Sequence, residues 1–303
     1  MIDVLIRAGC MIGLMLLGML LRRVKLFGPD DHKVVSKIIL NVTMPCMLVT
    51  SFSQYQLDLS LFSVILLGIG CNLILSGIGF LCAGRDWAGR AFNIINFSGF
   101  NIGCFLMPFA QTFFGPEGIV VACMFDAGNV MMCTGLTYGI ASCVAPSGER
   151  GSLKLLAKSL FSSTPFITYL VLLLMTCFKL SFPGPILDFA SIAGNANTFL
   201  AMFMIGLVFE FKANRDNIFR VIRNVGVRYG VCAVLAVLFY FLLPFPLVVR
   251  QVLVLAVFSP LTVTAPIFTS KLHGDVSLSG ALNSICIPVS VLFVTVIMTV
   301  FQL

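Results

Sequence analysis

The sequence predicts an all-α polytopic membrane protein. Its ten transmembrane helices form two inverted five-helix repeats with broken, crossing fourth and ninth helices. Three features predict this fold: the apolar composition, the succession of apolar segments and the positions of the basic residues. Of the 303 residues, 59% are hydrophobic and 10% are charged, whereas soluble domains contain roughly 25% charged residues. The composition therefore excludes a water-soluble globular protein.

The apolar segments have the length and pattern of membrane helices. A helix needs about 20 apolar residues to cross the hydrocarbon core, so ten spans use roughly 200 residues and leave about 100 for connections. Residues 231–243 are apolar on all sides, unlike barrel strands, which alternate apolar and polar residues. We expect spans at residues 4–21, 34–52, 59–81, 91–113, 119–144, 165–180, 186–209, 225–243, 247–270 and 277–301.

Lysine and arginine predict the orientation of the spans, since cytoplasmic loops are enriched in them. The odd-numbered connections contain fourteen, at Arg22, Arg23, Lys25, Lys33, Arg85, Arg90, Arg150, Lys154, Lys158, Lys212, Arg215, Arg220, Arg223 and Lys271. The other side has three, Arg7, Lys179 and Arg250, while Lys37 and Arg228 fall just inside adjoining helices. We therefore expect an integral protein of the bacterial inner membrane with both termini outside the cytoplasm.

Ten spans with both termini on the same side of the membrane divide into two halves of five spans each. Because five is odd, a duplicated half must lie inverted in the membrane. We expect a first repeat at residues 1–144, a cytoplasmic connecting segment at 145–164 and a second repeat at 165–303. Within the connection, Leu153, Leu156, Ala157 and Leu160 follow helical spacing, which predicts an amphipathic helix on the membrane surface.

The fourth and ninth spans are rich in small, polar and helix-breaking residues. Residues 96–108 and 257–266 each end at a proline. Such interrupted spans at corresponding positions are typical of a secondary-transporter binding site, since a broken helix exposes backbone groups and its N-terminal end attracts carboxylates. Alternatively, the prolines and glycines only kink these helices. The candidate substrate-binding residues are Ser98, Asn101, Gly103, Pro108, Ser259, Thr262, Thr264 and Pro266.

Asp126 is the one acidic residue that we place deep within a span, about seven residues or roughly 10 Å from its outer end. An acid at this depth is costly and indicates a function, either binding a coupling proton or ligating a cation. An interhelical hydrogen bond is the alternative. Asn129, in the same segment, and Asn283, seven residues into the tenth span, are further candidates for the coupling site. Secondary polar sites are expected at Asn41, Pro45, Asn195 and Asn197, where interhelical hydrogen bonding is again the alternative.

Other kinds of chemistry find little support in the sequence. The eleven cysteines contain no Cys-x-x-Cys pair, and His32 and His273 lie in predicted loops, so we expect no disulfide framework, metal site or cofactor. The net charge of +7 comes from residues between spans, which does not indicate nucleic-acid binding. No phosphate-binding Gly-x-x-x-x-Gly-Lys-Ser/Thr loop is present, which disfavours transport driven by ATP in this chain alone.

Four short segments resemble the auxin efflux carrier family, which includes plant PIN carriers and bacterial permeases for malate and malonate. They are LFGPDDHK at 26–33, LNVTMP at 40–45, APIF at 265–268 and ALNS at 281–284. The resemblance implies two inverted five-helix repeats whose fourth and ninth helices cross at Pro108 and Pro266. It also implies a scaffold of the first, second, sixth and seventh helices, often dimeric, and a moving transport domain. The usual substrates are organic anions.

The sequence departs from the family in two ways. It lacks the long cytoplasmic loop of many plant members, and we find no lysine or arginine near the expected crossing. Helix ends and neutral side chains would therefore hold any carboxylate.

We expect a secondary active transporter of small organic anions such as carboxylates, not an enzyme, working by alternating access and driven by a proton or sodium gradient. The alternatives are a sodium-coupled symporter of the bile-acid type, an intramembrane enzyme and a non-transporting sensor. An enzyme would need two ionisable or metal-binding residues facing each other at depth, and the sequence offers one deep acid and no buried histidine.

Overall fold

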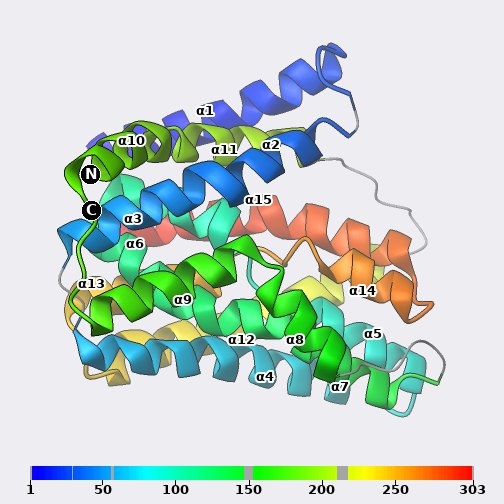
Figure 1. Cartoon of the computed structure of the whole chain (residues 1–303). Coiled ribbons are helices and arrows are strands. Elements are labelled where there is room, and N and C mark those ends of the chain that lie inside the picture. The colour runs from blue at the N-terminus through cyan, green and yellow to red at the C-terminus, as the bar shows by residue number, and fades with distance from the viewer. Residues whose placement is uncertain (1, 29, 56–57, 147–152, 210–217, 302–303) are drawn as a thin grey trace.

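The computed structural model describes residues 2–28, 30–55, 58–146, 153–209 and 218–301, so the predicted basic residues Arg150, Lys212 and Arg215 lie outside the described part. All the regular elements in these ranges are helical, and they run lengthwise through one bundle (Figure 1). Seven of the described helices are long and apolar enough to cross a membrane. The protein is therefore an integral membrane protein, as the composition predicts.

The first half contains both long and interrupted helices. They are α1 (Ile2–Arg23), α2 (His32–Ile38), the π-turn η1 (Ile39–Thr43), α3 (Met44–Gln54), the 3₁₀ turn η2 (Leu59–Leu61), α4 (Phe62–Cys82), α5 (Trp87–Phe97), η3 (Ile102–Leu106), α6 (Met107–Met131), η4 (Met132–Leu136) and α7 (Thr137–Val144). The run from Trp87 to Val144 is apolar on average, but its backbone leaves the helix at residues 98–101 and again at Gly115, where φ is 61°. The predicted fourth and fifth spans both fall in this run.

The second half repeats this alternation. Its helices are α8 (Leu153–Phe161), α9 (Thr164–Cys177), α10 (Gly184–Asn195), α11 (Asn197–Val208), α12 (Ile218–Leu242), α13 (Leu247–Val257), α14 (Ala265–Lys271) and α15 (Val276–Val300). The short helix α8 lies in the segment where the sequence predicts an amphipathic helix. The predicted ninth span is divided into α13 and α14, and α12 begins seven residues before the expected start at residue 225.

The helices form two groups that pack against each other. In the α1 group, α1 packs along α11, and α3 packs along α9 and α10. In the α4 group, α4 packs on α5 and α6, α13 lies between α6 and α12, and α15 contacts α12 and α14. Helix α6 also contacts α3, α9 and α11, so it lies at the interface of the two groups. In the most apolar stretch of the run Trp87–Val144, 78% of the residues are buried, whereas 22% are buried in the corresponding stretch of α1. The run Trp87–Val144 therefore lies at the centre of the bundle.

Two glycines bring α4 and α6 unusually close. A Cβ atom on Gly68 would lie 2.2 Å from the Phe125 carbonyl oxygen, and one on Gly128 would lie 2.0 Å from that of Ile65. Small residues allow this approach in membrane proteins, where close backbone packing holds helices together. The contact places the polar side chains that follow these glycines within reach of one another.

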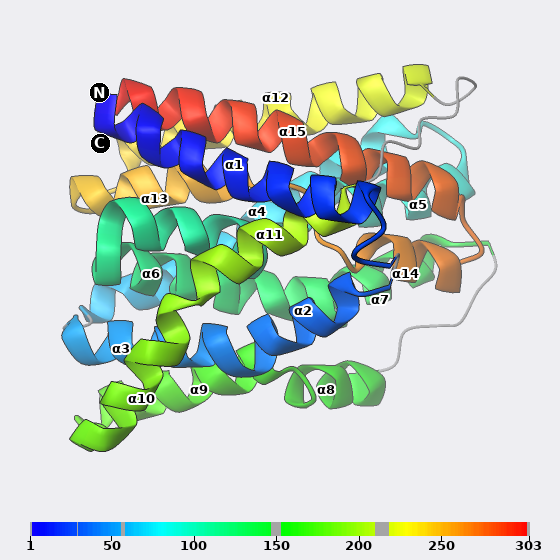
Figure 2. The ribbon, with the colours of Figure 1, turned by 90° about the horizontal axis from the view of Figure 1, so that it is seen from above.

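The two ends of the bundle differ in character. Helix α1 begins and α15 ends at the same end of the bundle (Figure 2). The last turns of α1 and α14 and the start of α5 lie at the opposite end (Figure 1), where α1 carries Arg22 and Arg23 and α14 carries Lys271.

Candidate functional site

The two interrupted helices meet in the interior. The first interruption separates α5 from η3, and the second separates α13 from α14. Between them, the Asn101 N–H donates a hydrogen bond of 2.9 Å to the Pro260 carbonyl. An exposed backbone group is costly in hydrocarbon, so this bond satisfies one group from each interruption.

The break in the first helix lies at residues 98–101, and Pro108 is not the crossing point. Pro108 is buried near the start of α6, where the helix continues from η3 without a break. Gly99 makes the break instead, because its φ of 85° is unfavourable for other residues and a Cβ there would lie 2.5 Å from Thr262 Cγ2. Pro266, in contrast, directly follows the second break, in the first turn of α14.

Two buried asparagines support the first break. Asn72 on α4 accepts a hydrogen bond of 2.6 Å from the Gly99 N–H. Asn129 on α6 accepts one of 3.0 Å from the Phe100 N–H and donates one of 2.8 Å to the Phe100 carbonyl. This pair of bonds to one residue determines which amide atom of Asn129 is oxygen and which is nitrogen. Asn72 also donates to Asn129 at 3.2 Å, which joins the two supports.

Asp126 lies beside these asparagines and is 4% exposed. Its Oδ1 accepts a hydrogen bond of 2.8 Å from Asn129 Nδ2, and its Oδ2 accepts one of 2.5 Å from the Tyr169 hydroxyl. Asn129 and Tyr169 both donate hydrogen bonds to the carboxylate, whereas a metal cation at this place would need further oxygen atoms as ligands. Because Tyr169 belongs to α9 of the α1 group and Asp126 to α6 of the α4 group, this hydrogen bond connects the two groups.

An arginine lies at the crossing, contrary to the expectation that no basic residue is near it. Arg228 of α12 is 1% exposed. Its guanidinium donates to the carbonyls of Phe97, Gly99 at 2.8 Å and Ser259 at 3.4 Å, and so contacts both interrupted helices. The expectation was wrong because α12 begins at residue 218, which places Arg228 about 15 Å inside the helix rather than at its end.

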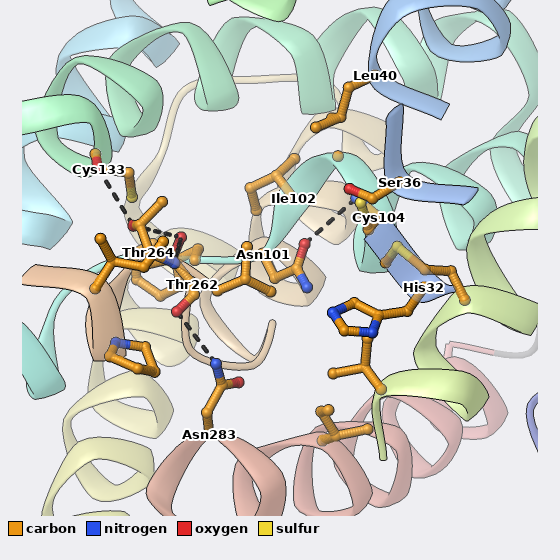
Figure 3. A pocket seen from close by; sticks show the side chains of 18 of the residues that line it. His32, Ser36, Leu40, Asn101, Ile102, Cys104, Cys133, Thr262, Thr264 and Asn283 are labelled. Atoms are coloured by element: carbon orange, nitrogen blue, oxygen red, sulfur yellow. Dashed lines mark hydrogen bonds between the residues drawn. The ribbon is translucent and has the colours of Figure 1, made fainter. Parts of the chain in front are cut away.

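A cavity of about 750 Å³ lies between the two helix groups, with the interrupted helices as its floor (Figure 3). The α1 group contributes His32, Ser36, Leu40, Met44, Pro165, Met204 and Val208 to its wall. Phe100, Asn101, Gly103, Asp126 and Asn129 line it from the first half of the α4 group, and Thr262, Thr264, Pro266, Gly280 and Asn283 from the second. Phe105, Leu106 and Met107 beyond the floor are fully buried. Since His32 and Lys33 at the start of α2 also line the cavity, it extends to the basic end of the bundle.

Neutral polar groups cluster on the cavity floor. Thr262 and Thr264 lie with their hydroxyls 3.2 Å apart, and Thr264 donates to the Cys133 carbonyl at 3.3 Å. Asn283 reaches over from α15 and donates to the Thr262 carbonyl at 3.3 Å, while Asn101 Oδ1 accepts from the Cys104 N–H at 3.4 Å (Figure 3). These four side chains surround a space that can accept a small polar ligand.

The remaining predicted residues lie outside the cavity lining. Ser98 and Ser259 are buried and donate to carbonyls of their own helices, those of Ile94 and Leu255. Asn197 accepts a hydrogen bond of 2.9 Å from Thr43 and joins α11 to η1, which is the interhelical alternative. Three lie elsewhere: Asn41 is exposed and accepts from Thr164, Asn195 is exposed, and Pro45 is half-buried.

Among the described residues, no group of three or more His, Cys, Asp and Glu side chains comes together as a metal site.

Comparison with known proteins shows that this chain is similar to membrane transport proteins. Residues 10–154 match the model of a family described as membrane transport protein. An uncharacterized transporter of Methanothermobacter thermautotrophicus is 28% identical over 214 residues, which cover 68% of each chain. Both matches are to membrane transport proteins, so the chain is similar to membrane transporters over the matched residues.

Three polar residues around the site were not predicted from the sequence. Asn72 stands thirteen residues into the predicted span 59–81, and its depth alone was a signal. Arg228 was placed just inside the start of its predicted span and was not recognised as a buried residue, although apolar residues surround it on both sides. Tyr169 gave no signal, since its hydrogen bond to Asp126 crosses 43 residues of sequence.

Proposed function

We propose that the chain is a secondary active transporter of small organic anions, such as carboxylates, working by alternating access about the contact of the two interrupted helices. The main support for this proposal is the cavity, because it lies between two groups of helices and ends at the interrupted segments. A relative shift of the two groups would open the opposite side of the floor.

The proposed topology has ten spans in two inverted repeats, with both termini outside the cytoplasm of a bacterial cell. Support comes from the interruptions after α5 and α13, which occupy matching places in the two halves, and from the common end of α1 and α15. The second and seventh spans are also irregular, at η1 and at Ala196. On this topology the cavity faces the cytoplasm. A homodimer formed through the α1 group is part of the same proposal.

Asp126 is the proposed site of the coupling proton. Asp126 lines the cavity, so a negative charge on its carboxylate opposes the binding of an anion there. A proton on Asp126 removes this charge, so the anion and the proton bind better together than separately. The donors Tyr169 and Asn129 fit a carboxylate rather than a sodium site, which favours proton coupling over the sodium-coupled alternative.

Uptake by proteoliposomes tests the proposal. Labelled mono- and dicarboxylates are offered with and without a proton gradient, after a thermal-shift screen has selected the acids that stabilise the purified protein. Thr264→Val removes a cavity hydroxyl at nearly constant volume and is expected to lower uptake about ten-fold, the effect of roughly one hydrogen bond. Thr299→Val in α15, whose hydroxyl bonds only its own helix, is the matched control. Absence of uptake for every acid, or equal uptake by both variants, would contradict the proposal.

A further inference from the structure

The structure assigns to Arg228 the role of a fixed internal cation that binds the ends of both interrupted helices, where a carrier would otherwise need a bound metal cation. Arg228 acts as a positioning residue, since it does not line the cavity. The inference rests on the proposed function only where it concerns transport. The part that concerns the binding of the helix ends depends only on the contacts of the Arg228 guanidinium.

Three backbone carbonyls converge on this one side chain. Those of Phe97 and Gly99 belong to the end of α5 and its break, and that of Ser259 lies just beyond α13. Both helices have eleven residues and end here, so each directs the negative end of its dipole at the guanidinium. A cluster of carbonyl oxygens without N–H partners is a ligand set for a cation.

No carboxylate balances the charge of Arg228. The described residues contain no ion pair between its guanidinium and an acidic side chain. The Nε atom is buried and has no hydrogen-bond partner. A buried charge is costly unless it is paired, and here the two helix ends and the Phe100 ring, 5.1 Å from the guanidinium carbon, take the place of a counter-ion.

The Phe100 ring lies between the positive charge of Arg228 and the cavity. Phe100 lines the cavity floor, with Arg228 on its other side. The positive charge is therefore close to the ligand but separated from it by an aromatic ring, and it cannot leave during a transport cycle as a bound sodium ion can. We infer that the crossing needs no sodium and that transport is independent of sodium.

Thermal unfolding of the purified full chain tests the structural part without any substrate. Midpoints are measured in choline, sodium, potassium and millimolar guanidinium chloride for the wild type, Arg228→Ala, Arg228→Gln and Arg228→Lys. The wild type should show equal midpoints in all four salts. Arg228→Ala should unfold at least about 5 °C lower and recover part of the loss in guanidinium, which is small enough to reach the vacated carbonyls.

The other variants separate charge from packing. Arg228→Lys keeps the cation and should retain most of the stability, whereas Arg228→Gln keeps only neutral donors and should resemble Arg228→Ala. Arg250→Ala is the control, because Arg250 also donates to a backbone carbonyl and lies over an aromatic ring, that of Tyr240, but not at a crossing. Its midpoint should not respond to guanidinium.

The results distinguish failure of this inference from failure of the proposed function. If no variant responds to guanidinium and Arg228→Lys is no better than Arg228→Ala, Arg228 is not a fixed cation. If Arg228→Ala does not fold, the comparison of Arg228→Lys with Arg228→Gln decides in the same way. Guanidinium-specific recovery supports the structural assignment even where no acid is taken up. Sodium-dependent uptake by the wild type would overturn the transport part alone.

Discussion

Replacing Asn129 by leucine, which has the same branched shape but no hydrogen-bonding groups, is expected to destabilise the protein about twice as much as replacing Asn72 in the same way. Asn129→Leu removes the hydrogen-bond partner of both the N–H and the carbonyl of Phe100, because both groups bond to the Asn129 amide. Asn72→Leu leaves one comparable group, the Gly99 N–H. An unsatisfied buried group costs about 1–3 kcal/mol, so the expected losses are about 2–6 kcal/mol for Asn129 and about 1–3 kcal/mol for Asn72.

Chemical denaturation in detergent, followed by circular dichroism, measures both losses in the same micelle. Asn195→Leu, at an exposed position, is the control and should change the free energy of unfolding by less than about 0.5 kcal/mol. The reasoning is refuted if Asn129→Leu costs no more than Asn72→Leu. It is also refuted if both behave like the control, since the broken backbone would then obtain its hydrogen bonds elsewhere.

Three further predictions concern the same site. Gly99→Ala should destabilise the protein by about 1–3 kcal/mol, because φ is 85° and the new Cβ would meet Thr262; an unchanged midpoint of unfolding would contradict this. Asp126→Asn should abolish the stimulation of uptake by a proton gradient while leaving substrate exchange at equal pH measurable, and persistent stimulation would remove Asp126 from coupling. Tyr169→Phe removes one donor from the Asp126 carboxylate and should weaken the stimulation of uptake by a proton gradient, because the hydrogen bond between the two helix groups is lost; unchanged stimulation would contradict the role of this contact.

The apolar pattern predicted the helices because span length and loop charge are local properties of a membrane sequence. The two unusual spans were identified from their small and polar residues, and the structure interrupts both. The position of the first break was predicted less well. Proline was taken as the marker, but Pro108 lies where the helix continues from η3 without a break, while the positive φ at Gly99 and its contact with Thr262 make the break.

Residues whose partners lie far away in the sequence were not predictable. Asp126 was found from its depth alone, yet its donor Tyr169 is 43 residues away. Arg228 was counted as an orientation signal, because a sequence gives no sign that carbonyls 129 and 131 residues away will converge on it. Its burial changes the electrostatics of the site, which contains a fixed positive charge next to the neutral side chains that were expected to hold an anion.

Filling the cavity tests the central claim most directly. Gly280 lines the cavity, and a Cβ on it would meet no atom within 4 Å, so Gly280→Trp places an indole ring in the proposed pathway without a clash at its base. Gly230 in α12 is equally open, exposed and outside the cavity, which makes Gly230→Trp the matched control. In proteoliposomes, Gly280→Trp should abolish carboxylate uptake while Gly230→Trp retains it. Full uptake by a folded Gly280→Trp protein would contradict the claim that substrate passes through this cavity.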